Sequence, residues 1–203
     1  MNNFDTLFDN SCLPNIINKA KTISKKECSA LFDYMAEYKP VNILEFGCQH
    51  GCSTRVFLEM TRWLDYKVNL HSWDIDNKVI YIKQKDFTLH IENLTNKEQD
   101  ILSYKPDLVF LDAHPYTLTY NLTKLCLDNK INFMCHDISF AIIEALKKRS
   151  NDYKDKSIYA AWEPYVLSEL ISDKILTDNY YEDDRVIVDC VRDLYGLAIV
   201  KNK

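Results

Sequence analysis

Residues 41–53 read VNILEFGCQHGCS, and this stretch governs the fold. The apolar run 41–46 predicts a short strand, and the loop after it leads into apolar residues at helical spacing. Two of the three glycines in the chain, Gly47 and Gly51, lie in this loop. Glycine admits positive φ angles and lets a ligand lie against bare backbone. The stretch therefore indicates a small-molecule cradle, with an ordinary strand-to-helix turn as the alternative.

The composition limits the classes of partner. The chain has 203 residues, 47% of them hydrophobic, and a formal net charge of -5. Such a chain can fold as one domain with a sizeable core. The sequence has no long run of Lys and Arg, so we do not expect it to bind a nucleic acid through the phosphate backbone. No stretch approaches the roughly 20 apolar residues that span a bilayer, so no membrane partner is expected.

The cysteines and the N-terminus indicate a cytoplasmic protein. Seven cysteines are scattered through the sequence without a disulfide-like framework. Cys48 and Cys52 are four positions apart, but no second pair or histidine spacing completes a zinc site. The N-terminal residues show neither the basic region nor the apolar core of a signal peptide. Reduced thiols and the absence of such a signal favour the cytoplasm.

Predicted strands and helices alternate along most of the chain. Ser24 and Glu27 have the spacing of a capping box before a helix, and Pro40 is expected to end that helix by forcing Lys39 into extended geometry. Strands are expected at 41–46, 68–74, 87–91, 107–112, 131–135, 185–191 and 194–200. Helices are expected at 28–38, 56–64, 79–84, 95–104, 118–125, 138–146 and 159–172, with an exposed loop at 150–156 and an acidic turn at 182–184.

This alternation predicts an α/β fold with a doubly wound, mostly parallel sheet of seven strands and helices on both faces. Only Arg192 and Asp193 separate the last two strands, which permits a two-residue hairpin. We therefore expect this pair to be antiparallel and to lie at one edge of the sheet. Residues 41–200 would form the core of a single domain, 1–203, with residues 1–39 as a helical lead-in.

The carboxyl ends of five predicted strands carry polar, mostly acidic residues: Glu45, Asp74, Asn93, Asp112 and the pair His136-Asp137. Ligands of doubly wound sheets bind at this edge. A dinucleotide would bring a pyrophosphate, which a carboxylate beside the loop repels. A ligand with a sulfonium or ammonium group and no phosphate suits the edge better. S-adenosylmethionine is such a ligand, with a ribose diol for Asp74.

Three motifs carry a resemblance to a known family. They are Ile43-Leu44-Glu45-Phe46-Gly47 with Gly51-x-Ser53, then Asp107-Leu108-Val109-Phe110-Leu111-Asp112-Ala113-His114, then Cys135-His136-Asp137-Ile138. Over residues 41–200 the sequence resembles class I S-adenosylmethionine-dependent methyltransferases. Within that class it resembles the small-molecule O-methyltransferase branch that includes macrocin O-methyltransferase-like and cephalosporin-hydroxylase-like proteins. The resemblance implies a Rossmann-like fold, methyl transfer to a hydroxyl group of a small molecule, and a homodimer as an option.

The resemblance also implies a set of cofactor-binding residues. The methionine end of S-adenosylmethionine would lie against the loop and its flanks: Glu45, Phe46, Gly47, Cys48, Gln49, Gly51 and Ser53. Asp74 would bind the ribose hydroxyls, with Asp76 as the second candidate. Asn93 stands near the expected adenine, and Asp112 near the methyl group.

Metal-dependent members of the family bind a divalent ion at positions that correspond here to Asp112, His136 and Asp137. Catechol-type members use a lysine three residues after the first of these, but this chain has Pro115 there, which excludes a lysine base. His114 is then the best placed proton acceptor, since its unperturbed pKa lies near neutrality. Asp112 and His114 are accordingly the expected catalytic residues.

Other interpretations of these residues and of the fold remain open. Asp74, Asp76, Asp112 and Asp137 could each be helix N-caps, and His114 could be a loop histidine bonded to backbone. The same sheet could also belong to a nucleotide-cofactor oxidoreductase, although the third glycine of that motif is missing. A third hypothesis is a non-catalytic binding module that keeps only the methyltransferase fold.

Overall fold

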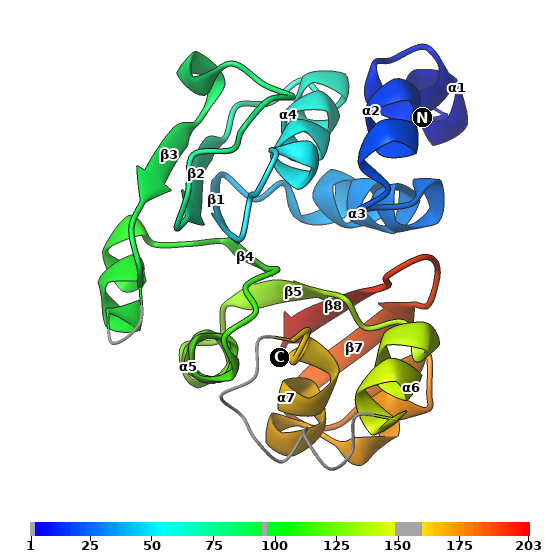
Figure 1. Ribbon diagram of the computed structural model, residues 1–203, viewed down its shortest axis with the longest axis vertical. Helices are drawn as coiled ribbons and strands as arrows, with labels where there is room; N and C mark the ends of the chain where they lie inside the picture. Colours follow the sequence, from blue (N-terminus) through cyan, green and yellow to red (C-terminus); the bar gives the residue numbers. More distant parts are fainter. Residues whose placement is uncertain (1–2, 95–96, 149–159) are drawn as a thin grey trace.

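The computed structural model describes residues 3–94, 97–148 and 160–203. Its centre is one eight-stranded sheet with the order β3-β2-β1-β4-β5-β8-β7-β6 (Figure 1). The strands are β1 (Asn42–Phe46), β2 (Asn69–Asp74), β3 (Thr88–Ile91), β4 (Leu108–Leu111), β5 (Asn132–His136), β6 (Tyr180–Glu182), β7 (Val186–Val191) and β8 (Leu197–Asn202). Strands β3, β2, β1, β4 and β5 are parallel, whereas β8, β7 and β6 pair antiparallel. The predicted α/β class, parallel core and antiparallel C-terminal pair are confirmed.

The count of seven strands was wrong because of β6. This strand has three residues and lies at the edge of the sheet beside β7. Its sequence, Tyr180-Tyr181-Glu182, is too short to show an alternating pattern, and Tyr180 and Glu182 are exposed. Consequently β7 and β8 both lie inside the sheet, and the acidic turn after Glu182 connects β6 to β7.

The two-residue hairpin was also wrong, since β8 begins only at Leu197 and residues 192–196 form the connection. Hydrogen bonds from Arg192 and Gly196 hold this longer loop. The Arg192 guanidinium donates to the carbonyl oxygens of Ile138, Ile175 and Asp178. The amide of Gly196, which has a φ of 89°, donates to a carboxylate oxygen of Glu27 at 2.7 Å. The loop is therefore fixed by distant parts of the chain that local sequence cannot reveal.

Helices cover both faces of the sheet, and Figure 1 shows α1–α4 on one side and α5–α7 on the other. The helices are α1 (Phe4–Asp9), α2 (Leu13–Ala20), α3 (Lys25–Tyr38), α4 (Cys52–Trp63), α5 (Tyr116–Asp128), α6 (Phe140–Lys148) and α7 (Glu163–Leu170). Strand residues alternate between two cores: Ile43, Phe110 and Met134 pack with α1–α4. Leu44, Val109 and Phe133 pack with α5 and α7. This alternation follows from the two-residue period of a strand buried on both faces.

The start of α3 is as predicted, but its end is not. The Ser24 hydroxyl accepts a hydrogen bond from the Glu27 amide, and the Glu27 carboxylate accepts one from the Ser24 amide, which completes the capping box. Lys39 was expected to be extended, but it has a φ of 47° in the left-handed region. Its amide donates to the carbonyl oxygen of Met35. Pro40 thus follows a left-handed C-cap, a common way to end a helix.

The connections after β2 and β3 also differ from the sequence pattern. The expected helix at 79–84 is absent, and only the 3₁₀ turn η1 (Gln84–Asp86) forms there. The amides of Ile80 and Tyr81 donate instead to the carbonyl oxygen of His50, so this segment packs onto the glycine loop. The expected helix at 95–104 is the 3₁₀ segment η2 (Glu98–Tyr104) in its described part.

Two further predictions concern residues 150–172. The expected helix at 159–172 appears as α7, which is followed by the 3₁₀ segment η3 (Asp173–Leu176). The expected loop at 150–156 lies outside the described residues. Within the described part of the chain, no helix is both long enough and apolar enough to span a membrane.

Candidate functional site

The glycine loop between β1 and α4 lies against the end of β4. The Gly47 amide donates to the carbonyl oxygen of Trp73 at 2.9 Å, and the Asp112 amide donates to the carbonyl oxygen of Phe46 at 2.9 Å. Gly47 has a φ of 89°, and a Cβ atom there would lie 2.1 Å from the carbonyl oxygen of Asp112. This close approach of two backbones explains why residue 47 is a glycine.

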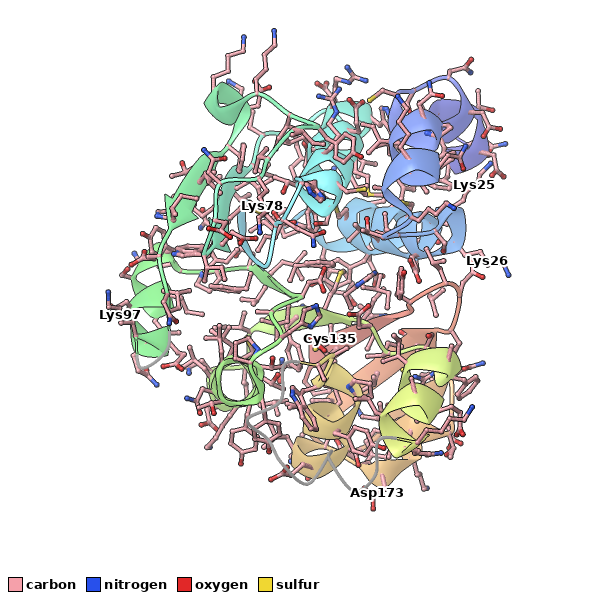
Figure 2. All side chains as sticks on the ribbon, in the orientation of Figure 1. Lys25, Lys26, Lys78, Lys97, Cys135 and Asp173 are labelled. Atoms are coloured by element: carbon pink, nitrogen blue, oxygen red, sulfur yellow. The ribbon has the colours of Figure 1, made fainter. Side chains whose placement is uncertain are left out.

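Two cavities meet at this edge of the sheet. The first, of about 280 Å³, is lined by the acidic ends of β4 and β5, by Lys21 and Thr22 before α3, and by Tyr195. The second, of about 310 Å³, lies between the ends of β1, β2 and β4. Gly47, Asp74, Ile75, Asp112 and His114 line both cavities, so the two are adjacent. Lys78, labelled in Figure 2, also lines the first.

The second cavity is mostly apolar and has an aromatic wall. Trp73 stacks between Phe46 and His90, with ring centroids 5.0 and 4.2 Å away. The indole Nε1–H donates to the Glu92 carboxylate at 3.2 Å, which fixes the ring. Asn93 and Glu92 add polar groups at the rim. This combination fits a flat, largely apolar ring that carries polar substituents.

Glu45 does not line either cavity, although the sequence placed it in the cofactor site. Its side chain is fully buried under the loop and accepts hydrogen bonds from the hydroxyls of Ser53, Thr54 and Ser72, at 2.5, 2.5 and 2.6 Å. Burial raises the pKa of Glu45, and the three hydroxyls oppose that shift. The carboxylate therefore ties the start of α4 to β1 and β2. Cys48, Gly51 and Ser53 likewise line neither cavity.

We expect Glu45→Ala to lower the free energy of unfolding by about 3 to 5 kcal/mol, because the hydroxyls of Ser53, Thr54 and Ser72 would lose their acceptor. Glu45→Gln keeps the shape and one acceptor oxygen, and should cost clearly less. Urea denaturation of both variants checks this. A small loss in Glu45→Ala with a large loss of ligand affinity would show that the carboxylate contacts a ligand instead.

Asp74 occupies the position expected of a ligand-binding acid. One of its oxygens accepts from the Gln49 amide at 2.7 Å and the other from the Asp76 amide at 3.2 Å. It lines both cavities and caps no helix, because none follows it before η1. Gln49, at a φ of 45°, also lines the first cavity. Asp76 lines neither and pairs with Lys78 at 2.9 Å.

The ends of β4 and β5 bring together two carboxylates and two imidazoles. The Nε2 atom of His114 lies 3.7 Å from Asp112 Oδ1 and 3.7 Å from Asp137 Oδ2. One ligand atom from each of these three residues lies within 4.8 Å of the others. On the other side, His136 Nδ1 lies 3.7 Å from Asp112 Oδ1 and 3.2 Å from Asp137 Oδ1. Every residue expected here is thus in the cluster.

The electrostatics of the cluster are unusual. His136 is almost fully buried, and neither of its ring nitrogens has a hydrogen bond of good geometry among the described residues. Burial lowers the pKa of His136, but the carboxylates of Asp112 and Asp137 outweigh it and raise that pKa well above its ordinary value. Within the described residues, no Lys or Arg pairs with either aspartate. The carboxylates outnumber the fixed positive charges, which favours a bound cation.

Asp137 is not the N-cap that the alternative interpretation proposed. It has a φ of 60° in the left-handed region, and α6 begins only at Phe140. The Ser139 hydroxyl accepts from the Ile142 amide, a contact of the capping kind. The left-handed turn directs the Asp137 carboxylate towards His114 and His136. Asp112 also caps no helix, since Pro115 precedes α5.

Glu163, which no sequence pattern singled out, faces the cluster from the start of α7. Its carboxylate is fully buried, and Oε1 lies 3.6 Å from His114 Nδ1. Burial, together with the charges of Asp137 and Asp112, raises the pKa of Glu163 well above its usual value. Acidic residues are common in the first turn of a helix, so the sequence alone does not distinguish Glu163 from an ordinary helix-start acid. Only the packing of α7 against α5 brings it to the site.

The comparisons with known proteins support the fold. No protein-family model matches the sequence, and no curated protein matches it. An O-methyltransferase from Bacillus cereus in complex with SAH matches with a TM-score of 0.60 and 15% identity, over 98% of this chain and 96% of that one. The SAH-bound Podospora anserina methyltransferase PaMTH1 matches with a TM-score of 0.54 and 18% identity, over 98% and 93%.

A third structure, CmcI with Mg-SAM, matches with a TM-score of 0.51 and 16% identity, over 84% of this chain and 69% of that one. At such identities the likeness concerns the path of the chain and not the chemistry of the site. The protein therefore has the fold of S-adenosylmethionine-dependent O-methyltransferases.

Proposed function

We propose that the protein is an S-adenosylmethionine-dependent methyltransferase that methylates a hydroxyl group of a small molecule with the help of a divalent ion. The observation that carries the proposal is the junction of the two cavities. An aromatic-walled slot and a cluster of carboxylates and imidazoles share Gly47, Asp112 and His114. A cofactor seated in the slot would thus reach the cluster, where an acceptor can lose a proton.

The slot offers groups that suit each part of the cofactor, which supplies an activated methyl group when bound. Trp73 and Phe46 would hold the adenine, with Asn93 at its rim. Asp74 would bind the ribose hydroxyls. The backbone of Gly47 and Gln49 would hold the methionine end, and Glu45 keeps that loop in place from below. A dinucleotide would place its pyrophosphate against the glycine loop, beside carboxylates and without a Lys or Arg from that loop. This distribution of charge argues against a dinucleotide.

The cluster suits a divalent ion. One ligand atom each from Asp112, Asp137 and His114 lies within 4.8 Å of the others. His136 adds a ring nitrogen that lies 3.2 Å from Asp137. Asp112 and Asp137 would be the oxygen ligands, with nitrogen from His136, as the sequence suggested, or from His114. A divalent ion held there lowers the pKa of a coordinated hydroxyl group.

The residues of the chain would position the acceptor and take its proton. Lys21, Thr22 and Tyr195 line the first cavity together with the cluster, so they would contact a small-molecule substrate. Holding the acceptor oxygen in line with the methyl donor removes much of the entropic part of the activation barrier for methyl transfer. Without an ion, His114 would be the proton acceptor, because it faces both aspartates and lies in both cavities.

The first test is cofactor binding. We expect the protein to bind S-adenosylhomocysteine saturably in calorimetry and to show no binding of NAD. Asp74→Ala should weaken that binding by about 1 to 3 kcal/mol, the loss of a hydrogen bond to a charged group. Asp76→Ala is the matched control, because Asp76 lies outside both cavities.

Two results would contradict the proposal. Saturable NAD binding without a response to S-adenosylhomocysteine would favour an oxidoreductase. Cofactor binding without methyl transfer to any member of a panel of phenols, catechols and sugars would favour a non-catalytic binding module.

A further inference from the structure

Glu163 stands out among the fully buried acids of the protein because neither of its carboxylate oxygens accepts a hydrogen bond from another described residue. Its side chain has no exposed surface, and neither carboxylate oxygen forms a hydrogen bond to another described residue. The other fully buried acids differ: Glu45 accepts from three hydroxyls, and Glu27 accepts from two backbone amides. An unsatisfied buried carboxylate costs several kcal/mol. Such a cost indicates a function.

The contact of Glu163 with His114 suggests what that function is. Glu163 Oε1 lies 3.6 Å from His114 Nδ1, which is slightly longer than the usual distance between a hydrogen-bond donor and its acceptor. The other ring nitrogen of His114, Nε2, points between Asp112 and Asp137 at 3.7 Å from each. The three carboxylates therefore surround one imidazole, two at Nε2 and one at Nδ1. Histidines that bind metals commonly donate their second nitrogen to a carboxylate, which fixes the tautomer and the ring.

We propose that Glu163 is a positioning residue that accepts a hydrogen bond from His114 Nδ1–H and thereby presents Nε2 as a nitrogen ligand to the ion between Asp112 and Asp137. This inference rests on the metal-assisted form of the proposed function. It deepens that function by naming a ligand and a residue that orients it. His114 would then hold the ion, and the acceptor hydroxyl would lose its proton to solvent or to a free carboxylate oxygen.

An imidazole ligand affects which divalent ion the cluster should prefer. Mg²⁺ prefers oxygen ligands in a strict octahedral arrangement, whereas imidazole favours transition metals such as Co²⁺, Fe²⁺, Ni²⁺ and Zn²⁺. A centre with an oriented imidazole should thus bind Co²⁺ more tightly than Mg²⁺. Because Glu163 provides the orientation, the preference should depend on that residue, which does not itself touch the ion.

The experiment is a titration of metal-free protein with Co²⁺ alone, followed by visible absorption, with Mg²⁺ as competitor. Wild-type protein should bind one Co²⁺ and release it only to a large excess of Mg²⁺. Glu163→Gln should weaken Co²⁺ binding about 10- to 100-fold. Glu169→Gln is the matched control on α7, since its carboxylate accepts from the Tyr116 hydroxyl and is not at the cluster. It should bind Co²⁺ like wild type.

A second measurement keeps Glu163 intact, so it does not depend on whether Glu163→Gln folds. The chain has five histidines, so the ¹⁵N signals of His114 in the metal-free protein can be assigned by comparison with His114→Ala. We expect the Nδ1–H tautomer. An Nε2–H tautomer, or unchanged Co²⁺ affinity in Glu163→Gln, would overturn the inference, as would wild-type protein that binds no Co²⁺. Failure of the proposed function is distinct, because it would appear as absent S-adenosylhomocysteine binding in protein that still binds Co²⁺.

Discussion

A chelator is expected to stop methyl transfer and leave S-adenosylhomocysteine binding in place. Asp112 and Asp137 would lose the cation that we propose for this cluster, whereas the aromatic slot around Trp73 would be unchanged. The expected loss of rate is about 10²- to 10⁴-fold, which corresponds to about 3 to 5 kcal/mol. Activity should return when a divalent ion is added. The measurement is methyl transfer to an accepted substrate, with calorimetry of the same chelated sample.

Asp137→Ala should remove both the activity and its rescue by metal, because one of the two oxygen ligands is gone. Asp128→Ala is a suitable control, since Asp128 is exposed at the end of α5 and, among the described residues, forms its ion pair with Lys124. Activity that is indifferent to the chelator, together with a large rate loss in His114→Ala, would instead establish the metal-free route with His114 as base. Full activity in both variants would refute the site assignment.

Gly47→Ala is expected to lower the free energy of unfolding by about 3 to 5 kcal/mol. The new Cβ would lie 2.1 Å from the carbonyl oxygen of Asp112, where backbone and not a flexible side chain must move. The positive φ adds about 1 to 2 kcal/mol for an L-residue, and overpacking adds the rest. Since Asp112 moves with its carbonyl, the variant should also lose cofactor and metal binding where it still folds.

The neighbouring glycine provides the matched control for this prediction. Gly51→Ala also has a positive φ, but its Cβ would meet only the side-chain carbons of Val79 and Ile82, at 3.1 Å or more. We expect it to cost about 1 to 2 kcal/mol. Thermal and urea unfolding of the two variants checks the difference. Equal losses would show that the contact with Asp112 does not determine the stability of the loop.

The sequence predicts the parallel half of the fold because its signals are local. The first five strands are apolar or alternating stretches of sequence, and each is followed by a polar residue at or near its carboxyl end. Since the carboxyl ends of parallel strands meet at one edge, Asp112, His114, His136 and Asp137 could be placed together without a structure. The structure brings all four into one cluster.

The remaining features depend on contacts between distant residues. Glu163 reaches the cluster only through the packing of α7, and as a first-turn acid it had another sufficient explanation. The segment 79–84 has the composition of a helix, but its amides bind the carbonyl oxygen of His50. The sequence interpretation placed Glu45 at the methionine end of the cofactor, yet its carboxylate accepts hydrogen bonds from Thr54 and Ser72 inside the protein. In each case tertiary structure overrode the local pattern.

The hydrogen bond from Gly196 to Glu27 has a consequence for synthesis of the protein on the ribosome. The two residues are 169 positions apart, and the same carboxyl group lies 4.0 Å from His136. At about 5 to 20 residues per second, Gly196 is added about 10 to 30 s after Glu27. Strands β1–β5 and their glycine loop can form during that interval. The Gly196 amide can reach Glu27 only afterwards, so the carboxyl group beside His136 gains its second backbone donor last, after the strands that carry the cluster.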